Sequence, residues 1–410
     1  MLSPLFILSL AGLGLAISGP EIPGFCARNP LLSFEYDLCW SAPIRSVPNL
    51  DTDKPANPAP SSPSTSNQTG WDGPRHCVRE WCVYSNRQFS GGIVVITNSE
   101  NVERISRLPD TTTTRSGAPP FYSTEVPGKG VGLVANRTIR RGEPIMTWQP
   151  TYMIHRRLTE ALSAEEQQRI LDAALLKLPA ARRRAFSRQL GQFGVHHVSD
   201  ILLTNSFQMD VGGPNHEGHH LGNFPDVSRF NHDCRPNVAF RIDDQLTHHT
   251  HAVRDIAAGE ELTLAYMNPF ETYAVRQQHI LESWGFKCTC RHCSMSEKEI
   301  QESDARLHEI DELSAELENF ASTKASIRMV KRFIELHEKE RLDAKMHGAH
   351  VVAALNYNLF GDAKNARKHA RLAAETGIVE FGPEAGDVKA MEELAKSPEK
   401  HFTWRKRLRR

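Results

Sequence analysis

Three cysteines within six residues are the feature that most constrains how this chain can fold. The run Cys288-Thr-Cys290-Arg-His-Cys293 supplies three thiolates, one short of the four ligands of a closed tetrahedral zinc site. A disulfide within the run is disfavoured because such close spacing strains the bond geometry. His292 is an alternative ligand, but it lies between two better-placed thiols. We therefore expect a zinc site that takes a fourth ligand from elsewhere in the chain.

The first eighteen residues (1–18) predict a cleaved secretory signal peptide. Leu5–Ile17 is an apolar run too short to span a bilayer comfortably. Ala16 and Ser18 place small residues where signal peptidase requires them, with cleavage before Gly19. No Lys or Arg precedes the run, so a misassigned start codon and a buried strand remain alternatives. No other stretch reaches transmembrane length, and we expect a soluble product without a membrane partner.

The eight cysteines fall into two groups, one on each side of the chain's middle. Behind a signal peptide the N-terminal four are expected to form two disulfides, with three possible connectivities: Cys26, Cys39, Cys77 and Cys82. Four free thiols are the alternative. The sequons Asn67-Gln-Thr69 and Asn136-Arg-Thr138 would accept a glycan only in the secretory pathway.

Composition divides the remainder of the chain. Residues 19–120 form an N-terminal arm, in which 41–70 are rich in Pro, Ser, Thr and Asn and should be an extended linker without a core. Short strand-like runs separated by Gly and Arg turns then predict a compact α+β domain at 121–270. A helical insertion interrupts that domain at 151–200.

Several elements of this domain carry specific signals. Ser163 and Glu166 form a capping box at the start of an amphipathic helix, and Pro179 opens a second, Arg-rich helix that ends at Gly191. Strands are expected over Ala252–Ile256 and Glu261–Tyr266.

The C-terminal part of the chain is predicted to be helical. After the cysteine region at 271–295, apolar residues recur at steps of three and four throughout 296–410. Ala363, Ala366, Ala370 and Ala373 give one helix a small-residue face suited to close packing. These paired helices resemble a tetratricopeptide-like array with few repeats, and we expect a helical lobe that binds a partner or covers the domain.

Three separated segments carry the chemistry. Gly128-Lys129-Gly130-Val-Gly132 lets the backbone approach a ligand closely, although most such turns are plain hairpins and no Walker pattern follows. Arg229-Phe-Asn231-His232-Asp-Cys234-Arg-Pro236-Asn237 places a polar Asn-His pair beside a rigid proline, which is unusual for an ordinary turn. Gly259-Glu-Glu261-Leu-Thr-Leu-Ala-Tyr266 is a strand-like run that ends in a tyrosine.

In this order the three segments resemble those of SET-domain protein-lysine methyltransferases. The resemblance covers 121–293 and implies a β-clip fold of small sheets, with the second segment threaded under another strand as a pseudoknot. It implies an S-adenosylmethionine site contacted by Lys129 and Gly130, and by Asn231 and His232 largely through main-chain groups. Tyr266 would contact the cofactor and orient the attacking lysine amine as the catalytic residue.

The same resemblance identifies Cys234 as the fourth zinc ligand. A residue about fifty positions upstream of the cysteine run must then lie within reach of the same metal. Loss of Cys234 should therefore damage both folding and activity.

Two further positions are similar to the subgroup in which an insertion splits the SET domain, the SET and MYND type. Leu203-Thr-Asn205-Ser-Phe207 resembles a strand whose asparagine contacts the cofactor. Trp284-Gly-Phe286 resembles the post-SET entry, whose aromatic ring covers the cofactor and lines the lysine channel. The insertion contains no cysteine, so the MYND zinc module is absent and the chain looks closer to fungal Set5-like proteins.

Other polar clusters receive simpler interpretations. Eight histidines in Gly-rich loops or in an alternating polar strand are expected at the solvated surface: His196, His197, His216, His219, His220, His248, His249 and His251. The terminal Trp404-Arg-Lys-Arg-Leu-Arg-Arg410 is a nuclear signal, an acidic-partner contact or a frayed solvated tail. Because Lys+Arg and Asp+Glu balance at 49 each, direct nucleic-acid binding is not indicated.

The sequence thus predicts methylation of a lysine on a protein substrate, histone or non-histone. A catalytically silent SET scaffold and a secreted effector acting through its helices are the alternatives. The compartment is contested, because the N-terminus indicates secretion whereas the cofactor is abundant in cytosol and nucleus.

Overall fold

The computed structural model describes residues 70–110, 118–213 and 217–408, all within one compact unit. The expected signal peptide, the Asn67 sequon, Cys26, Cys39 and nearly all of the linker lie outside the described residues. Within the described ranges, no helix combines the length and apolar character needed to cross a membrane.

The first sheet is six-stranded, and one parallel pair, β3 with β7, joins its antiparallel parts. Its strands in spatial order are β1 (Trp71–Val78), β2 (Trp81–Asn86), β3 (Ile93–Thr97), β7 (Tyr152–His155), β9 (His219–Asn223) and β8 (Ser206–Asp210). Helix α1 (Ser99–Ser106) follows β3, capped by the Asn98 side chain, which accepts from the Asn101 N–H.

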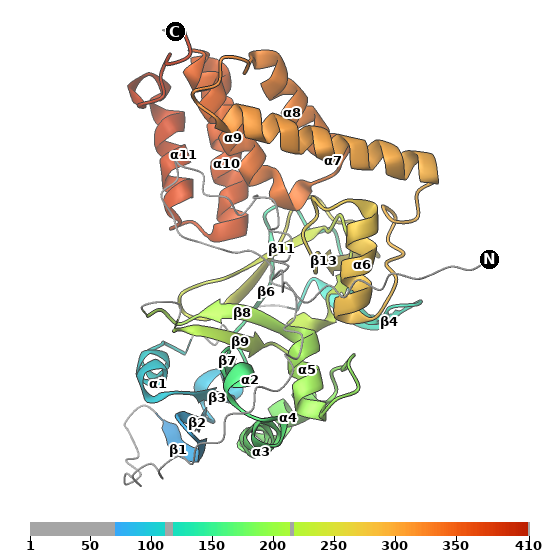
Figure 1. The fold of residues 1–410 in the computed structure, drawn as a ribbon, viewed down its shortest axis with the longest axis vertical. Coiled ribbons are helices and arrows are strands. Elements are labelled where there is room, and N and C mark those ends of the chain that lie inside the picture. Colours follow the sequence, from blue (N-terminus) through green and yellow to red (C-terminus); the bar gives the residue numbers. More distant parts are fainter. Residues whose placement is uncertain (1–69, 111–117, 214–216, 409–410) are drawn as a thin grey trace, which may run out of the picture. The chain divides into compact units, whose positions relative to one another are not determined.

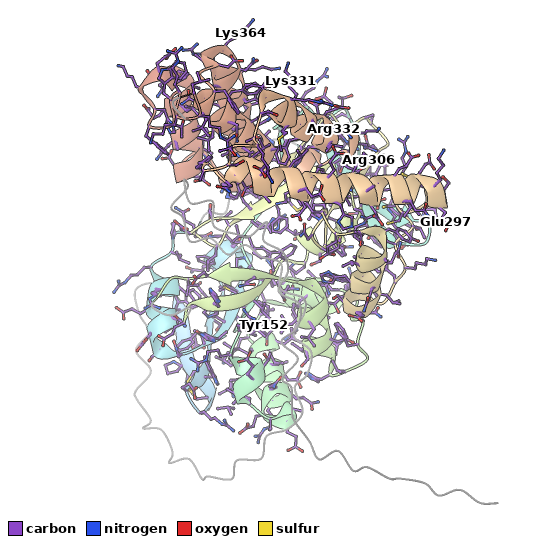
Figure 2. The ribbon with its side chains drawn as sticks, turned by 45° about the horizontal axis from the view of Figure 1, so that its top comes forward. Tyr152, Glu297, Arg306, Lys331, Arg332 and Lys364 are labelled. Carbon is purple, nitrogen blue, oxygen red and sulfur yellow. A yellow bond between two sulfur atoms is a disulfide. The ribbon has the colours of Figure 1, made fainter. Side chains whose placement is uncertain are left out.

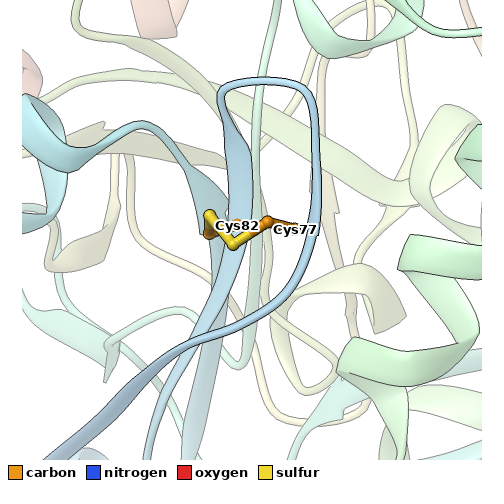
Figure 3. The surroundings of a disulfide bond; sticks show 2 residues. All are labelled: Cys77 and Cys82. Atoms are coloured by element: carbon orange, nitrogen blue, oxygen red, sulfur yellow. A yellow bond between two sulfur atoms is a disulfide. The ribbon is translucent and has the colours of Figure 1, made fainter. Parts of the chain in front are cut away.

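A disulfide closes the β1–β2 hairpin at its turn, joining Cys77 to Cys82 (Figure 3). The bond spans only five positions of sequence. One of the predicted N-terminal disulfides is therefore present, whereas the prediction for Cys26 and Cys39 concerns residues outside the described ranges.

Two smaller sheets complete the β structure. The four-stranded sheet orders β10 (Asn231–His232), β13 (Glu261–Leu264), β5 (Gly130–Ala135) and β4 (Phe121–Val126). The three-stranded sheet orders β11 (Val238–Ile242), β12 (His248–Ala252) and β6 (Pro144–Trp148). Their apolar faces share one core, which includes Leu133, Ile145, Phe230 and Leu262.

The strand predicted over Ala252–Ile256 is misplaced, because β12 ends where that prediction begins. The strand instead covers the polar stretch before it, in which His248, Thr250 and Ala252 are buried on one face. Beyond Ala252 the chain leaves the sheet, and buried Ile256 forms an isolated antiparallel bridge with Ile139, while exposed Asp255 accepts hydrogen bonds from Arg140 and from the backbone of Arg141.

Helices fill the insertion between β7 and β8: α2 (Leu158–Ala161), α3 (Ala164–Leu175), α4 (Ala180–Ser187) and α5 (His197–Asn205). The predicted capping box is confirmed, since Ser163 and Glu166 bond each other's backbone N–H reciprocally. Helix α3 packs on β1, β2 and β3. The second predicted helix ends at Ser187 instead of Gly191, because Asp200 draws the following chain into a turn by accepting the N–H groups of Gln192 and Gly194.

The C-terminal part is helical (Figure 1), with elements α6 (Tyr273–Trp284), α7 (Glu297–Glu318), α8 (Ile327–Lys339), α9 (Met346–Leu359), α10 (Ala363–Phe381) and α11 (Gly386–Lys396). Three-residue 3-10 turns occur at Phe89–Gly91, Val227–Arg229, Asp343–Lys345 and Pro398–Lys400. The expected alanine face of α10 is confirmed, since Ala366, Ala370 and Ala373 are fully buried in a helix that packs on α9 and α11. Figure 2 shows Arg306 on α7 and Arg332 on the neighbouring α8.

The frayed-tail interpretation of the C-terminus is wrong for residues up to 408. Thr403 is buried and its hydroxyl accepts from the Asn358 side chain, while the Arg407 backbone N–H donates to the Leu359 carbonyl. These bonds satisfy carbonyl and amide groups at the end of α9, which explains why the segment folds back onto the helices.

Candidate active site

The site is organised by the parallel pairing of β10 with β13. In this pairing Asn231 lies opposite Thr263 and His232 opposite Leu264. Tyr266 follows two residues after the end of β13, where its backbone N–H donates to His232 Nδ1 at 3.1 Å. Its hydroxyl donates to the Phe230 carbonyl at 2.6 Å. The structure thus brings the expected catalytic tyrosine against the segment that carries the Asn-His pair. Tyr266 and Phe230 are 36 positions apart in sequence.

Glu261 joins two more of the predicted residues. Its carboxylate accepts from Lys129 Nζ at 2.7 Å and from Asn231 Nδ2 at 2.9 Å. Sequence reasoning did not assign this role to Glu261, although its place at the start of the tyrosine strand, facing a lysine turn, was a usable signal. Because the Asn231 amide is held by Glu261, the backbone of the Asn-His segment is the part left for a ligand.

Two glycines leave space next to the Asn231–His232 segment. A Cβ on Gly132 would lie 2.7 Å from Asn231 Nδ2, so only glycine fits beneath the asparagine. Gly130, at the end of the β4–β5 hairpin, has φ +74° and no heavy atom within 4 Å of its Cβ position. The Gly-Lys-Gly segment is therefore a hairpin turn, and its backbone beside Lys129 faces open space.

Burial keeps the two central side chains neutral. Burial, and secondarily the charge of Glu261, raises the pKa of Tyr266 well above its ordinary value, so its hydroxyl stays protonated. Burial lowers the pKa of His232 to about 3, so its imidazole is uncharged at neutral pH. Tyr266 can therefore orient a partner by hydrogen bonding but is unsuited to act as a base.

Two aromatic side chains, one at the end of α6 and one just after it, border the site. The Trp284 ring lies 5.2 Å from the Tyr266 ring, and the Phe286 ring lies 6.4 Å from the His232 ring. Phe286 is 38% exposed, so its ring forms an edge of the site toward solvent. Trp284 was part of the recognised motif but received no role, and its distance from Tyr266 gives it one.

Asn205 lies differently from the prediction. It is the last residue of α5 and not part of a strand, because its side chain donates to the Ile201 carbonyl within the helix and to Leu190, and β8 begins one residue later. Its link to the site runs through its neighbour, since the Trp284 indole N–H donates to the Thr204 carbonyl at 3.2 Å.

The four C-terminal cysteines converge as predicted. Their sulfur atoms all lie within 4.8 Å of one another, and all four side chains are buried and free of disulfides: Cys234, Cys288, Cys290 and Cys293. The Cys234 sulfur is 3.9 Å from that of Cys288 and 3.5 Å from that of Cys293. Sulfurs at zinc-thiolate bond length on a tetrahedron are about 3.8 Å apart. The donor set and its spacing therefore fit a tetrahedral zinc ion.

His292 is not part of this cluster. Its Nε2 lies 3.2 Å from the Ser303 hydroxyl and 3.7 Å from the Glu340 carboxylate. The alternative in which His292 replaces a thiol is therefore not supported.

Two buried arginines surround the cluster. Arg276 is 1% exposed, and although burial lowers the pKa of its guanidinium, Cys234 and Cys293 raise that pKa more. Arg235 is 4% exposed and donates to the Cys234 carbonyl at 2.8 Å. A zinc ion with four thiolates carries a net charge of about −2, which the Arg276 guanidinium would partly offset, whereas the charge of Arg235 is paired with the Glu340 carboxylate at 3.0 Å.

The surface interpretation of the histidines is wrong for His220 and His248, which are both fully buried. His220 lies on β9 with its ring nitrogens bonded to Gly218 O and Thr97 Oγ1. His248 lies on the inner face of β12, stacked on Phe240 with ring centroids 4.8 Å apart. Both occupy inward positions of strands, which a run of consecutive histidines does not reveal.

Comparison with known proteins identifies the architecture. Residues 130–267 match the family model of the SET domain. The expected α+β class, with small mixed sheets and a helical C-terminal part, is confirmed.

Its relatives include lysine methyltransferases. "Histone-lysine N-methyltransferase set5" of Schizosaccharomyces pombe is 27% identical over 295 residues, covering 68% of this chain and 86% of that protein. "Histone-lysine N-methyltransferase SET5" of Meyerozyma guilliermondii is 40% identical over 75 residues, which are 18% of this chain and 16% of that protein. "N-lysine methyltransferase SMYD2-A" of Xenopus laevis is 31% identical over 126 residues, 29% of this chain and 28% of that protein. The last two matches thus span less than two thirds of those relatives.

Proposed function

We propose that this chain is an S-adenosylmethionine-dependent protein-lysine methyltransferase, acting on a histone or non-histone protein. The observation that carries the proposal is the attachment of Tyr266 to residues 230–232: its backbone N–H donates to His232 Nδ1 and its hydroxyl donates to the Phe230 carbonyl. This geometry lies inside the SET domain. The names of the relatives support the reaction class.

The cofactor would lie along the backbone of Lys129, Gly130, Asn231 and His232, with Phe286 as an aromatic cover. Bound S-adenosylmethionine supplies an electrophilic methyl group on a sulfonium. The Asn231 side chain is held by Glu261, which orients the neighbouring main-chain groups before any ligand arrives.

Tyr266 would position the attacking amine. Its hydroxyl proton is donated to the Phe230 carbonyl, so the oxygen lone pairs remain free to accept from an amine N–H or a polarised methyl C–H. The surrounding rings exclude water and favour the neutral form of a lysine, because an apolar environment lowers the lysine pKa. The reaction then needs orientation more than acid-base assistance.

The cysteine cluster would hold a structural zinc ion. Four protein ligands close a tetrahedral site, which leaves no open position for a substrate or water. Its proposed role is to join the Cys234 turn to the 288–293 loop, which brings Phe286 to the site.

The first test is methyl transfer from labelled S-adenosylmethionine to a lysine-rich protein mixture. We expect Tyr266→Phe to keep the thermal midpoint within a few degrees and lower turnover about tenfold or more, since it loses one hydrogen-bonding group. Tyr122→Phe, on the half-exposed ring of β4, is the matched control and should transfer at the wild-type rate. A folded wild type that binds no cofactor by calorimetry would refute the enzyme and favour a silent scaffold.

Partners and compartment are further parts of this proposal. The 86% coverage of the S. pombe protein supports a place in the fungal Set5-like subgroup. The packed helices α7–α11 offer a rigid, tetratricopeptide-like surface for a protein partner.

A secretory route is proposed from residues 1–18, and imaging of a C-terminal fluorescent fusion with and without these residues tests it. Identical nuclear signal from both forms would refute it.

A further inference from the structure

We infer that the His232 side chain is a positioning residue that couples the cysteine cluster to Tyr266. One of its ring nitrogens bonds the Cys234 sulfur, and the other bonds the Tyr266 backbone. The inference rests on the proposed function, because it assumes a metal on the cysteines and a catalytic role for Tyr266. It goes beyond that function, in which His232 contributes only main-chain contacts to a cofactor.

The tautomer of the ring follows from its two neighbours. The Tyr266 backbone N–H can only donate, so Nδ1, at 3.1 Å, must be an acceptor without a proton. A neutral imidazole then carries its proton on Nε2, which lies 3.3 Å from the Cys234 sulfur. His232 is 4% exposed, so bulk water does not compete for either bond.

On the cluster side, the ring would hold a metal-bound thiolate. An N–H group that donates to a ligand atom fixes its direction and spreads its charge, and loss of such a partner costs 10-fold to 100-fold in metal affinity. Cys234 depends on this because its turn is 54 positions away from the nearest other cysteine of the cluster.

On the tyrosine side, the His232 ring takes the place of the neighbouring-strand carbonyl that would otherwise accept the Tyr266 backbone N–H. β13 ends at Leu264, and the Tyr266 N–H lies beyond its ladder. His232 Nδ1 accepts this N–H and so fixes the backbone from which the Tyr266 ring projects. A change in metal occupancy would therefore reach Tyr266 through a single imidazole.

Two substitutions separate the two bonds. His232→Asn retains an oxygen near the position of Nδ1, and His232→Gln retains an amide donor near the position of Nε2. We expect the asparagine variant to lose zinc to a competing chelator 10-fold to 100-fold more readily, with slow hydrogen exchange retained at the Tyr266 amide. We expect the glutamine variant to retain zinc and to exchange that amide at least tenfold faster.

Activity adds a third readout. Because the glutamine variant loosens Tyr266, its kcat should fall more than its KM for the protein substrate rises. A ring that merely fills space predicts instead that both variants lose stability, metal and amide protection in parallel, and that result would overturn the inference. His220→Asn and His220→Gln are matched controls, since they remove another buried imidazole with two bonded nitrogens, and they should leave zinc retention and Tyr266 exchange unchanged.

A measurement on the wild type covers the case in which neither variant folds. Nitrogen NMR of histidine-labelled protein should show His232 protonated at Nε2 and bare at Nδ1, and the opposite tautomer would overturn the inference. Failure of the proposed function gives a different result. If the wild type binds no zinc, both the proposed zinc site and the coupling are refuted. If the wild type binds zinc but the asparagine and glutamine variants behave alike, only the coupling is refuted.

Discussion

His248 illustrates at the residue scale how burial governs the behaviour of a titratable group. Its ring is fully buried against Phe207, Phe224 and Phe240, and neither nitrogen has a hydrogen-bond partner among the residues that the structure describes. Burial lowers its pKa to about 3, from an ordinary value of 6.5. His220 has the same depressed pKa of about 3, again mainly through burial, but both of its nitrogens are bonded.

These shifts predict acid sensitivity. Between pH 6.5 and about 3 the unfolded chain binds protons at these two histidines that the folded chain does not. The free energy of unfolding is therefore unaffected by them above pH 6.5 and decreases as the pH falls below that value. We expect His248→Phe to flatten this loss by up to about 1.4 kcal/mol per pH unit without destabilising the protein at pH 7. His220→Phe should flatten it equally but destabilise the protein at pH 7, because it leaves Thr97 and Gly218 unpaired. Urea unfolding at pH 7 and pH 5 measures both, and an unchanged pH slope in both variants would contradict the argument.

At the scale of elements, the close approach of β5 to the β10–β13 pair shapes the site. Gly132 on β5 sits under Asn231, and a Cβ there would also lie 3.1 Å from Glu261 Oε1. Any side chain at this position must displace the asparagine or its carboxylate partner. The glycine therefore matters for its contact distance and not for an unusual backbone conformation.

Gly132→Ala should accordingly weaken cofactor binding as well as stability. We expect a loss of about 1–3 kcal/mol in the free energy of unfolding, the usual cost of overpacking, and at least tenfold weaker binding of S-adenosylmethionine by calorimetry. Gly142→Ala is the control: its φ of +79° makes alanine strained, yet no heavy atom lies within 4 Å of the new Cβ. It should destabilise the fold while cofactor affinity stays at the wild-type value, and equal losses of affinity would contradict a local role for Gly132.

At the scale of the whole described unit, one buried ion pair ties the SET segment to the C-terminal helices. Arg235, next to Cys234, bonds the Glu340 carboxylate at 3.0 Å, and both side chains are at most 2% exposed. Ser303 and Arg306 on α7 bond the same carboxylate. Glu340 thus joins α7, the end of α8 and the turn that carries a cluster cysteine.

Removing one member of this pair should affect both parts. We expect Glu340→Ala to cost about 3–5 kcal/mol of stability, because it leaves a buried guanidinium without its charge partner, and to reduce methyl transfer as well. Glu309→Ala, which breaks the exposed pair with Arg332 between α7 and α8, should cost no more than about 1 kcal/mol. Chemical unfolding compares the two, and similar small losses would show that the buried pair is dispensable.

Local patterns in the sequence determined much of this protein. The Ser163–Glu166 capping box, the alanine face of α10 and each of the three SET segments taken by itself are set by residues close together in the chain. They were readable because helix periodicity and capping act over a few residues. The gathering of Cys288, Cys290 and Cys293 in a zinc site was also predicted from their spacing, whereas Cys234 was assigned as the fourth ligand through resemblance to a known family.

Other features were decided by the tertiary structure. The clamp of Glu261 on Lys129, the burial of His220 and His248, and the Arg235–Glu340 pair join positions up to 132 residues apart in sequence. The end of the Arg-rich helix at Ser187 likewise depends on Asp200, in the next helix. Local spacing carries no information on such partners, because each contact exists only after distant strands and helices have packed and excluded water.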